Sequence, residues 1–246
     1  MRQSVRILFI PGLGADRRMY APLMAHLHSA GLKFQAVHLQ YVSMRHRREP
    51  LEAYARRIFT EQKPGRRFDL IIGCSLGGMI AQSAIEQKLV HTDRLVLIST
   101  THSHADLTRL SQILGRVLYH TPGSLSTGIL RLLVRIYPLL RRSVSQAAEM
   151  ARMAAESPPG FLFQGTYLAL NWRSITRNAD KLRSIIKSGL APDTFRVHGT
   201  SDPLIGWKKV IRLPLPGLVF DGGNHIIVVT RADTIARAIV YRYGWF

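Results

Sequence analysis

A serine between two glycines, directly after a buried apolar run, is the sequence feature that most constrains the fold. Residues 70–72 form a continuous apolar run, which is typical of a strand covered on both faces in a parallel sheet. Helical periodicity begins at Met79, so Gly73-x-Ser75-x-Gly77 is predicted to be a tight strand-to-helix turn. Such a turn strains the backbone of its serine and lifts the hydroxyl above the sheet edge. The pattern also fits a glycine-rich turn without chemistry, so its context has to decide.

Further apolar runs alternate with helical stretches on both sides of this turn. Besides residues 70–72, strands are predicted at residues 5–10, 34–38, 93–99, 194–198 and 217–220. Helices are predicted at residues 17–29 with Asp16 as N-cap, at 51–61 after Pro50, at 79–86 and at 230–243. This alternation predicts an α/β fold with a six-stranded, mainly parallel sheet and helices on both faces. Binding chemistry on such a sheet lies at the carboxyl ends of the strands.

The pattern changes between residues 101 and 190, where no strand is predicted. Helical stretches appear instead at residues 105–119, 125–140, 143–156, 160–172 and 176–188. We therefore expect a core formed by residues 1–100 and 191–246, with residues 101–190 inserted as a helical cap. Residues 129–137 are apolar with interspersed arginines and also resemble a membrane-surface helix. Packing within the cap is the preferred interpretation, because interfacial helices usually have a cleaner polar face.

Three residue types that together activate a hydroxyl follow three separate predicted strands. Ser75, Asp202 and His225 occur in that order, each directly beyond a strand. A neutral serine is a weak nucleophile and needs a histidine base, which in turn needs a carboxylate to orient it. Asp221 and Asp106 are alternative acids, but triad partners usually come from separate strand ends, which favours Asp202.

These motifs together resemble the α/β-hydrolase family, and the resemblance covers nearly the whole chain apart from the cap. It implies that Ser75 is the nucleophile, Asp202 the acid and His225 the base. The backbone N–H groups of Leu13 and Leu76 would then form the oxyanion hole. The first loop departs from the family by starting with Pro11-Gly12 rather than His-Gly, and Cys74 precedes the serine. Neither departure removes a reacting group.

Other candidate residues are assigned roles in packing or in lining the pocket. Phe161, Tyr167 and Trp172 are expected to line a hydrophobic acyl pocket or to form the cap core. His102 and His104 either line the pocket or face solvent, and His198 is expected to pack at a strand end. No cofactor is expected: no histidines or carboxylates have metal-ligand spacing, and Gly12-x-Gly14 lacks the third glycine of a dinucleotide site.

The charge is unusual for such an enzyme. Lys and Arg number 34 against 15 Asp and Glu, a net charge of +19 that would suit nucleic acid or another polyanion. The basic residues are scattered, however, and no nucleic-acid-binding motif accompanies them, so nucleic acid is not expected as a partner. One cysteine, no apolar run long enough to span a membrane and a short N-terminal apolar run indicate a cytoplasmic protein. Nothing in the sequence indicates the oligomeric state.

The sequence thus predicts a serine hydrolase that cleaves carboxylic esters with a small to medium hydrophobic acyl group. A C–C bond hydrolase, a thioesterase or a lyase would use the same three residues. A non-catalytic basic protein that binds anionic ligands is the alternative from another class.

Overall fold

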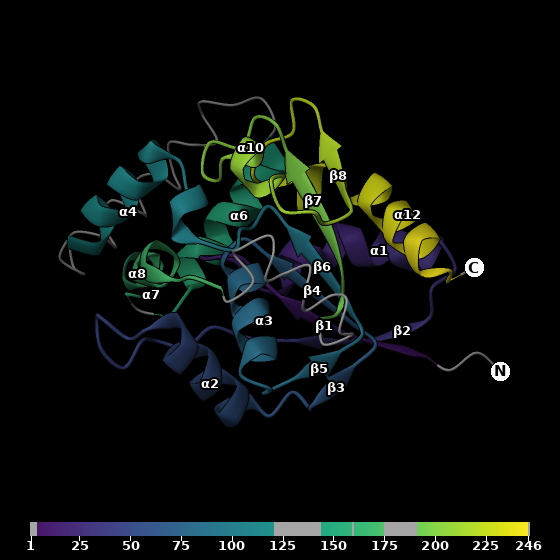
Figure 1. Cartoon of the computed structure of the whole chain (residues 1–246), viewed down its shortest axis with the longest axis horizontal. Helices are drawn as coiled ribbons and strands as arrows, with labels where there is room; N and C mark the ends of the chain where they lie inside the picture. Colours follow the sequence, from purple (N-terminus) through teal and green to yellow (C-terminus); the bar gives the residue numbers. More distant parts are fainter. Residues whose placement is uncertain (1–3, 121–143, 159, 175–190, 246) are drawn as a thin grey trace.

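A parallel sheet forms the centre of the protein. The computed structural model describes residues 4–120, 144–158, 160–174 and 191–245. Six strands form the sheet: β1 (Val5–Ile10), β2 (Phe34–His38), β4 (Leu70–Cys74), β6 (Arg94–Ile98), β7 (Asp193–Gly199) and β8 (Gly217–Phe220). Their order is β2-β1-β4-β6-β7-β8 and all neighbours are parallel, which confirms the predicted sheet (Figure 1). The serine strand β4 is therefore central.

Helices cover both faces of the sheet. On one face lie α1 (Ala21–Ser29) and α12 (Ala232–Tyr243), and on the other lie α2 (Leu51–Gln62) and α3 (Leu76–Glu86) (Figure 1). Successive strand residues point to opposite faces, so Ile7 and Phe9 pack in the α1/α12 layer while Leu8 and Ile10 pack in the other. All four side chains are fully buried. Burial on both faces explains why residues 7–10 of β1 and the whole of β4 read as unbroken apolar runs.

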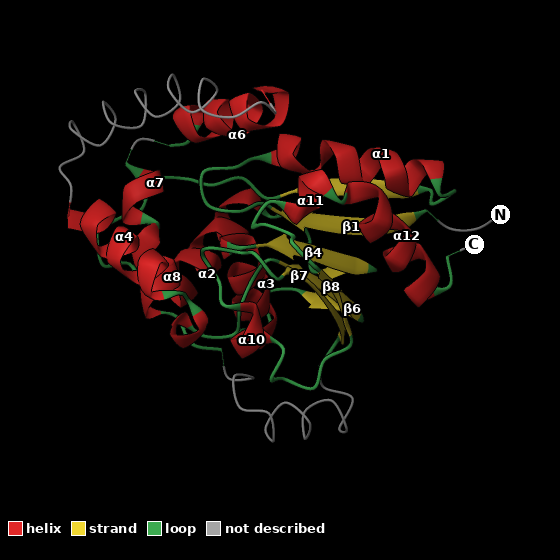
Figure 2. Cartoon of the chain, turned by 90° about the horizontal axis from the view of Figure 1, so that it is seen from above, coloured by secondary structure: helices red, strands yellow, loops and turns green. Residues whose placement is uncertain are grey.

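Further helices lie between β6 and β7 in the sequence. These are η2 (His104–Asp106), α4 (Arg109–His120), α6 (Val144–Glu156), α7 (Phe161–Gln164) and α8 (Thr166–Asn171). In Figure 2, α4, α7 and α8 gather at the end of the molecule opposite the two termini. The predicted helices at 125–140 and 176–188 lie outside the described residues. The predicted helix at 160–172 is divided at Gly165, where a Cβ would lie 2.7 Å from both Phe161 O and Leu13 Cδ1.

Several predicted boundaries were wrong. The expected helix at 17–29 is a 3₁₀ turn, η1 (Arg17–Tyr20), followed by α1, because Pro22 lacks an N–H and is accommodated only in a first turn. Asp16 does cap η1 by accepting the Arg18 N–H. The last predicted helix, 230–243, begins at Ala232 in the structure, and α11 (Ile227–Thr230) before it was not predicted. A short α10 (Trp207–Val210) and a second sheet of β3 (Arg67–Phe68) and β5 (His91–Thr92) were not predicted, since such short elements show no periodicity.

Gly77 lies where α3 packs closely against the end of β1. A Cβ on Gly77 would lie 2.1 Å from Ile10 O and 2.3 Å from Pro11 O, both of them rigid backbone atoms. We expect Gly77→Ala to lower the free energy of unfolding by about 3 kcal/mol or more, because the helix has to move away from the strand. Chemical denaturation followed by circular dichroism measures this loss.

Gly31→Ala is the matched control for this substitution. Gly31 has a φ of +85°, and a Cβ added to it would meet no other part of the chain within 4 Å, so the same change brings strain but no clash. We expect it to cost about 1–2 kcal/mol. Equal losses in the two variants would contradict the role given to the Gly77 contact.

Candidate active site

Ser75 occupies a strained turn between β4 and α3. Its φ is +50° and its ψ is −121°, a backbone conformation that non-glycine residues rarely adopt. The turn is tight because Gly73 and Gly78 approach each other: a Cβ on Gly73 would lie 2.6 Å from Gly78 Cα. Thr100 Oγ1 donates a 2.6 Å hydrogen bond to the Ser75 carbonyl. Ser75 is half-buried between buried neighbours, so the turn presents its side chain as the sequence predicts.

A chain of hydrogen bonds joins Ser75 to two residues from the far end of the sequence. His225 Nε2 lies 2.9 Å from Ser75 Oγ, and His225 Nδ1 lies 2.8 Å from Asp202 Oδ2. His225 follows β8 and Asp202 follows β7, so all three side chains meet at the carboxyl edge of the sheet. Of the three acids considered, Asp202 is the one bonded to His225. Asp221 instead accepts from Thr200 and Gly222, and Asp106 accepts from Thr101.

Asp202 is held as a buried carboxylate. Its side chain is fully shielded, and Oδ1 accepts the N–H groups of Leu204 at 2.8 Å and Ile205 at 3.0 Å. Burial raises the pKa of Asp202, but the hydrogen bond from His225 and the two backbone donors outweigh it, and the pKa lies below its ordinary value. These hydrogen bonds favour the ionised form of the Asp202 carboxyl.

His198 lies behind Asp202 in the interior. Its Nε2 is 3.2 Å from Ile205 O and 3.4 Å from Asp202 Oδ2, and its side chain is fully buried. Burial lowers the pKa of His198, so the ring is neutral and its proton belongs on Nε2, which faces the two acceptors. The sequence predicted a packed histidine but missed its contact with Asp202. The spacing of four residues to Asp202, across a loop, gave no signal for it.

Two backbone N–H groups are unpaired within the described parts of the chain, that of Leu13 in the loop after β1 and that of Leu76 at the start of α3. The loop itself is fixed: Tyr20 Oη donates to Ile10 O at 2.7 Å, and the Tyr41 hydroxyl donates to Pro11 O. Backbone N–H groups at a helix N-terminus and in a fixed loop can donate hydrogen bonds to an oxygen that develops negative charge. The two tyrosines carry no sequence signal and were missed.

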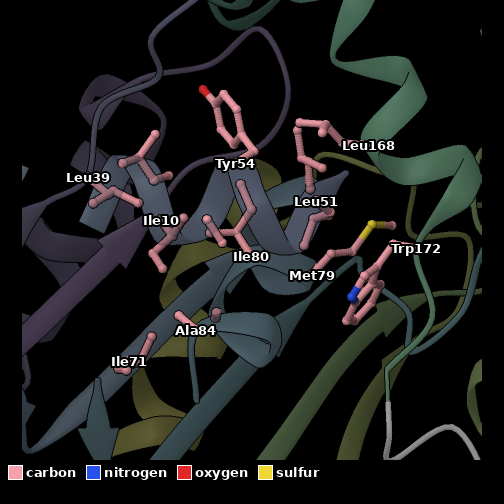
Figure 3. Packing of buried hydrophobic residues seen from close by; sticks show 14 of the residues in the cluster. Ile10, Leu39, Leu51, Tyr54, Ile71, Met79, Ile80, Ala84, Leu168 and Trp172 are labelled. Atoms are coloured by element: carbon pink, nitrogen blue, oxygen red, sulfur yellow. The ribbon is translucent and has the colours of Figure 1, made fainter. Parts of the chain in front are cut away.

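The aromatic residues expected near the pocket differ in their surroundings. Phe161 is fully buried and stacks on Tyr41, with ring centroids 4.7 Å apart, and Trp172 is buried in the cluster that contains Met79 (Figure 3). Packing is therefore the role that the structure gives to Phe161 and Trp172. Tyr167 is half-buried beside the Tyr119 ring, at 5.4 Å. Contact of any of the three with a substrate stays a prediction.

Cys74, the neighbour of Ser75, has a poorly reactive thiol. Its side chain is buried, and burial raises the pKa of its thiol well above the ordinary range, so the reactive thiolate does not form.

A profile of the alpha/beta hydrolase family matches residues 7–238. The chain belongs to this family. Comparison with curated protein sequences gives no significant match. The membership explains the parallel sheet, the serine turn after its central strand and the helices inserted after β6.

Solved structures share the fold of this alpha/beta hydrolase at low sequence identity. An esterase from Thermogutta terrifontis is 14% identical with a TM-score of 0.69, and the match covers 98% of this chain and 90% of that one. A meta-cleavage product hydrolase from Pseudomonas fluorescens is 16% identical, with a TM-score of 0.65 and coverage of 98% and 91%. An enol-lactonase from Burkholderia xenovorans is 15% identical, with a TM-score of 0.67 and coverage of 97% and 90%.

The described parts of this hydrolase contain neither a metal-binding cluster nor a membrane-spanning helix. In residues 4–120, 144–158, 160–174 and 191–245, no group of three or more His, Cys, Asp or Glu side chains is arranged to hold a metal ion. Within the same ranges, no helix combines the length and apolar character needed to cross a membrane.

His102, at the carboxyl end of β6, is buried rather than exposed, with 4% of its surface accessible. Burial lowers its pKa to about 3. Between about pH 6.5 and this value the unfolded chain binds a proton that the folded protein does not, so stability falls as the pH is lowered. We expect this residue to contribute a slope of up to about 1.4 kcal/mol per pH unit.

Urea unfolding between pH 4 and pH 7 measures that slope. His102→Gln removes the titrating ring. The slope of the free energy of unfolding against pH should therefore be smaller in the variant, by the contribution of one proton. Identical slopes for the variant and the parent would show that His102 does not stay neutral in the folded protein.

Proposed function

We propose that this alpha/beta hydrolase cleaves carboxylic esters through an acyl-enzyme formed on Ser75. The observation that carries the proposal is the continuous hydrogen-bonded chain from Ser75 Oγ to His225 at 2.9 Å and from His225 to Asp202 at 2.8 Å. The amides of Leu13 and Leu76, unpaired within the described parts of the chain, supply the second requirement, donors for an oxyanion. The family membership and the esterases among its structural neighbours agree with this chemistry.

In the first half-reaction, Ser75 Oγ attacks the ester carbonyl carbon while its proton passes to His225 Nε2. The carbonyl oxygen becomes an oxyanion and accepts hydrogen bonds from the Leu13 and Leu76 N–H groups. Asp202 stabilises the imidazolium through Nδ1. When the tetrahedral intermediate collapses, His225 returns the proton to the leaving alcohol, and the acyl group stays on Ser75.

In the second half-reaction, a water takes the place of the alcohol. His225 Nε2 accepts a proton from this water, whose oxygen attacks the acyl carbon. A second tetrahedral intermediate forms in the same amide site and collapses to the carboxylic acid, and Ser75 regains its proton. All proton transfers are carried by His225, so the cycle requires no cofactor.

The substrate is proposed to be an ester with a small to medium hydrophobic acyl group. We assign its selection to residues 101–190, as a helical cap inserted in a core of residues 1–100 and 191–246. A C–C bond hydrolase, a thioesterase and a lyase remain the alternatives with the same three residues, because low-identity neighbours include a protein described as a meta-cleavage product hydrolase.

A fluorophosphonate probe tests the activation of Ser75. We expect one adduct per chain, mapped to Ser75 by peptide mass analysis, with turnover of p-nitrophenyl acetate and butyrate. The adduct should be lost in Ser75→Ala and His225→Ala. Ser99→Ala is the matched control: Ser99 also ends a strand with a positive φ, of +44°, but its buried hydroxyl has no partner among the described residues.

Retained labelling and turnover in Ser99→Ala are expected. A folded parent protein with neither adduct nor turnover would overturn the hydrolase proposal and would leave the binding of anionic ligands, suited to a net charge of +19, as the function to test.

Paired substitutions of the two nearby acids test the choice of Asp202. We expect Asp202→Asn to lower kcat by about ten-thousandfold, because the amide leaves His225 in the wrong tautomer. Asp221→Asn should change kcat by less than about threefold, since Asp221 accepts hydrogen bonds from Thr200 and Gly222 and has none with His225. Steady-state kinetics on p-nitrophenyl butyrate, with thermal melts to verify folding, measure both. Similar losses in the two variants would exclude a specific role for Asp202.

A further inference from the structure

An apolar cavity lies between the start of α1, helix α6 and helix α11. Its volume is about 360 Å³, within the range of small-molecule pockets in proteins. The apolar side chains that line it are those of Met19, Ala21, Pro22, Met150, Met153 and Val229. Three of these six are methionines, whose flexible thioethers adapt to ligands of irregular shape.

Met19 borders both this cavity and the serine site. Its Sδ accepts the Gly12 N–H at 3.3 Å, in the loop that carries the Leu13 amide. A Cβ on Gly12 would lie 3.9 Å from Met19 Cε and 3.4 Å from Ser75 Cβ. The methyl end of Met19 and the Ser75 side chain therefore flank the same point. Val229, which also lines the cavity, belongs to α11, the helix that follows the His225 loop.

The one cation that lines the cavity among the described residues is engaged in ion pairs. Arg18 lines the cavity, and its guanidinium pairs with Asp16 at 2.6 Å, Glu156 at 2.5 Å and Glu149 at 3.3 Å. These pairs also connect the η1 segment to α6. With its cation engaged by three carboxylates, the cavity is suited to a neutral aliphatic group rather than to an anionic one.

We propose that this cavity binds the far end of an aliphatic acyl chain whose carbonyl carbon is attached to Ser75, and that the Met19 side chain controls the passage between them. The inference rests on the proposed ester hydrolysis and adds the acyl chain as the recognised part of the substrate. Each methylene that enters the cavity should improve recognition of the ester by roughly fourfold, from the burial of its surface.

Methionine-methyl NMR tests the cavity directly, independently of catalysis. The chain has seven methionines, of which Met19, Met150 and Met153 line the cavity, whereas Met24 and Met44 do not. On titration of the ¹³C-methyl-labelled protein with decanoate, the first three signals should shift, and those of Met24 and Met44 should stay. Acetate at the same concentrations should shift none of the cavity signals. Unmoved Met150 and Met153 signals at saturating decanoate would overturn the proposal.

Chain-length kinetics test the link to Ser75. Met150 is partly buried, and Met150→Trp would fill the cavity. We expect the ratio of kcat/KM for p-nitrophenyl decanoate to that for the butyrate to fall about tenfold or more, the effect of roughly two excluded methylenes. Met24→Trp makes the same change on α1 outside the cavity and should leave the ratio within about twofold. Met19→Ala should raise the ratio by widening the passage.

The two experiments separate this inference from the proposed function. An unchanged ratio in Met150→Trp, while both esters are turned over, would overturn the acyl-chain assignment and leave ester hydrolysis standing. Shifted Met150 and Met153 signals in a protein that cleaves neither ester would support an aliphatic-chain site and overturn the proposed function. If Met150→Trp does not fold, the NMR titration of the parent protein still decides.

Discussion

The contact of Gly77 with the carbonyl oxygens of Ile10 and Pro11 sets the geometry of the whole edge of the sheet. The absence of a side chain at this one position lets α3 approach the end of β1 closely. Because α3 begins at the residue after Ser75, the same approach fixes the serine turn relative to the Leu13 loop. The distance between Ser75 and the Leu13 N–H, one of its candidate oxyanion donors, is therefore set by contacts between backbone atoms and does not depend on a flexible side chain.

The strain of the Ser75 backbone is tolerated because its surroundings are rigid on every side. The turn is bounded by β4, which is central in the sheet and fully buried, and by the largely buried helix α3. Tyr20 and Tyr41 hold the adjoining loop through carbonyl oxygens, which leaves that loop's own N–H donors available. Asp202 is fixed in a similar way by two backbone amides. Positions with little conformational freedom thus surround the strained backbone of Ser75.

Much of the framework was predictable from sequence, for a physical reason. The bounds of the strands at 5–10 and 217–220 were predicted to the residue. In β1 the reason is two-sided burial of residues 7–10, which requires an apolar run, whereas β8 is an edge strand of exposed and half-buried residues. Ser75, Asp202 and His225 were brought together by the rule that parallel strands end at one edge. Two kinds of prediction failed. Periodicity joined helices that are divided at Pro22 and Gly165. The contact of His198 with Asp202 was missed because it depends on the tertiary fold and not on a local sequence pattern.

The Ser75–His225 hydrogen bond spans 150 residues of sequence, and this separation has a consequence for how the protein matures. Strands β1 to β6 carry the serine turn, whereas Asp202 and His225 arrive only with β7 and β8 at one side of the sheet. Contacts of such long range form late in folding, since their loop-closure entropy is the largest. A partly folded chain would lack this bond, so under the proposed function its serine would be inert, and formation of the bond would report that folding is complete.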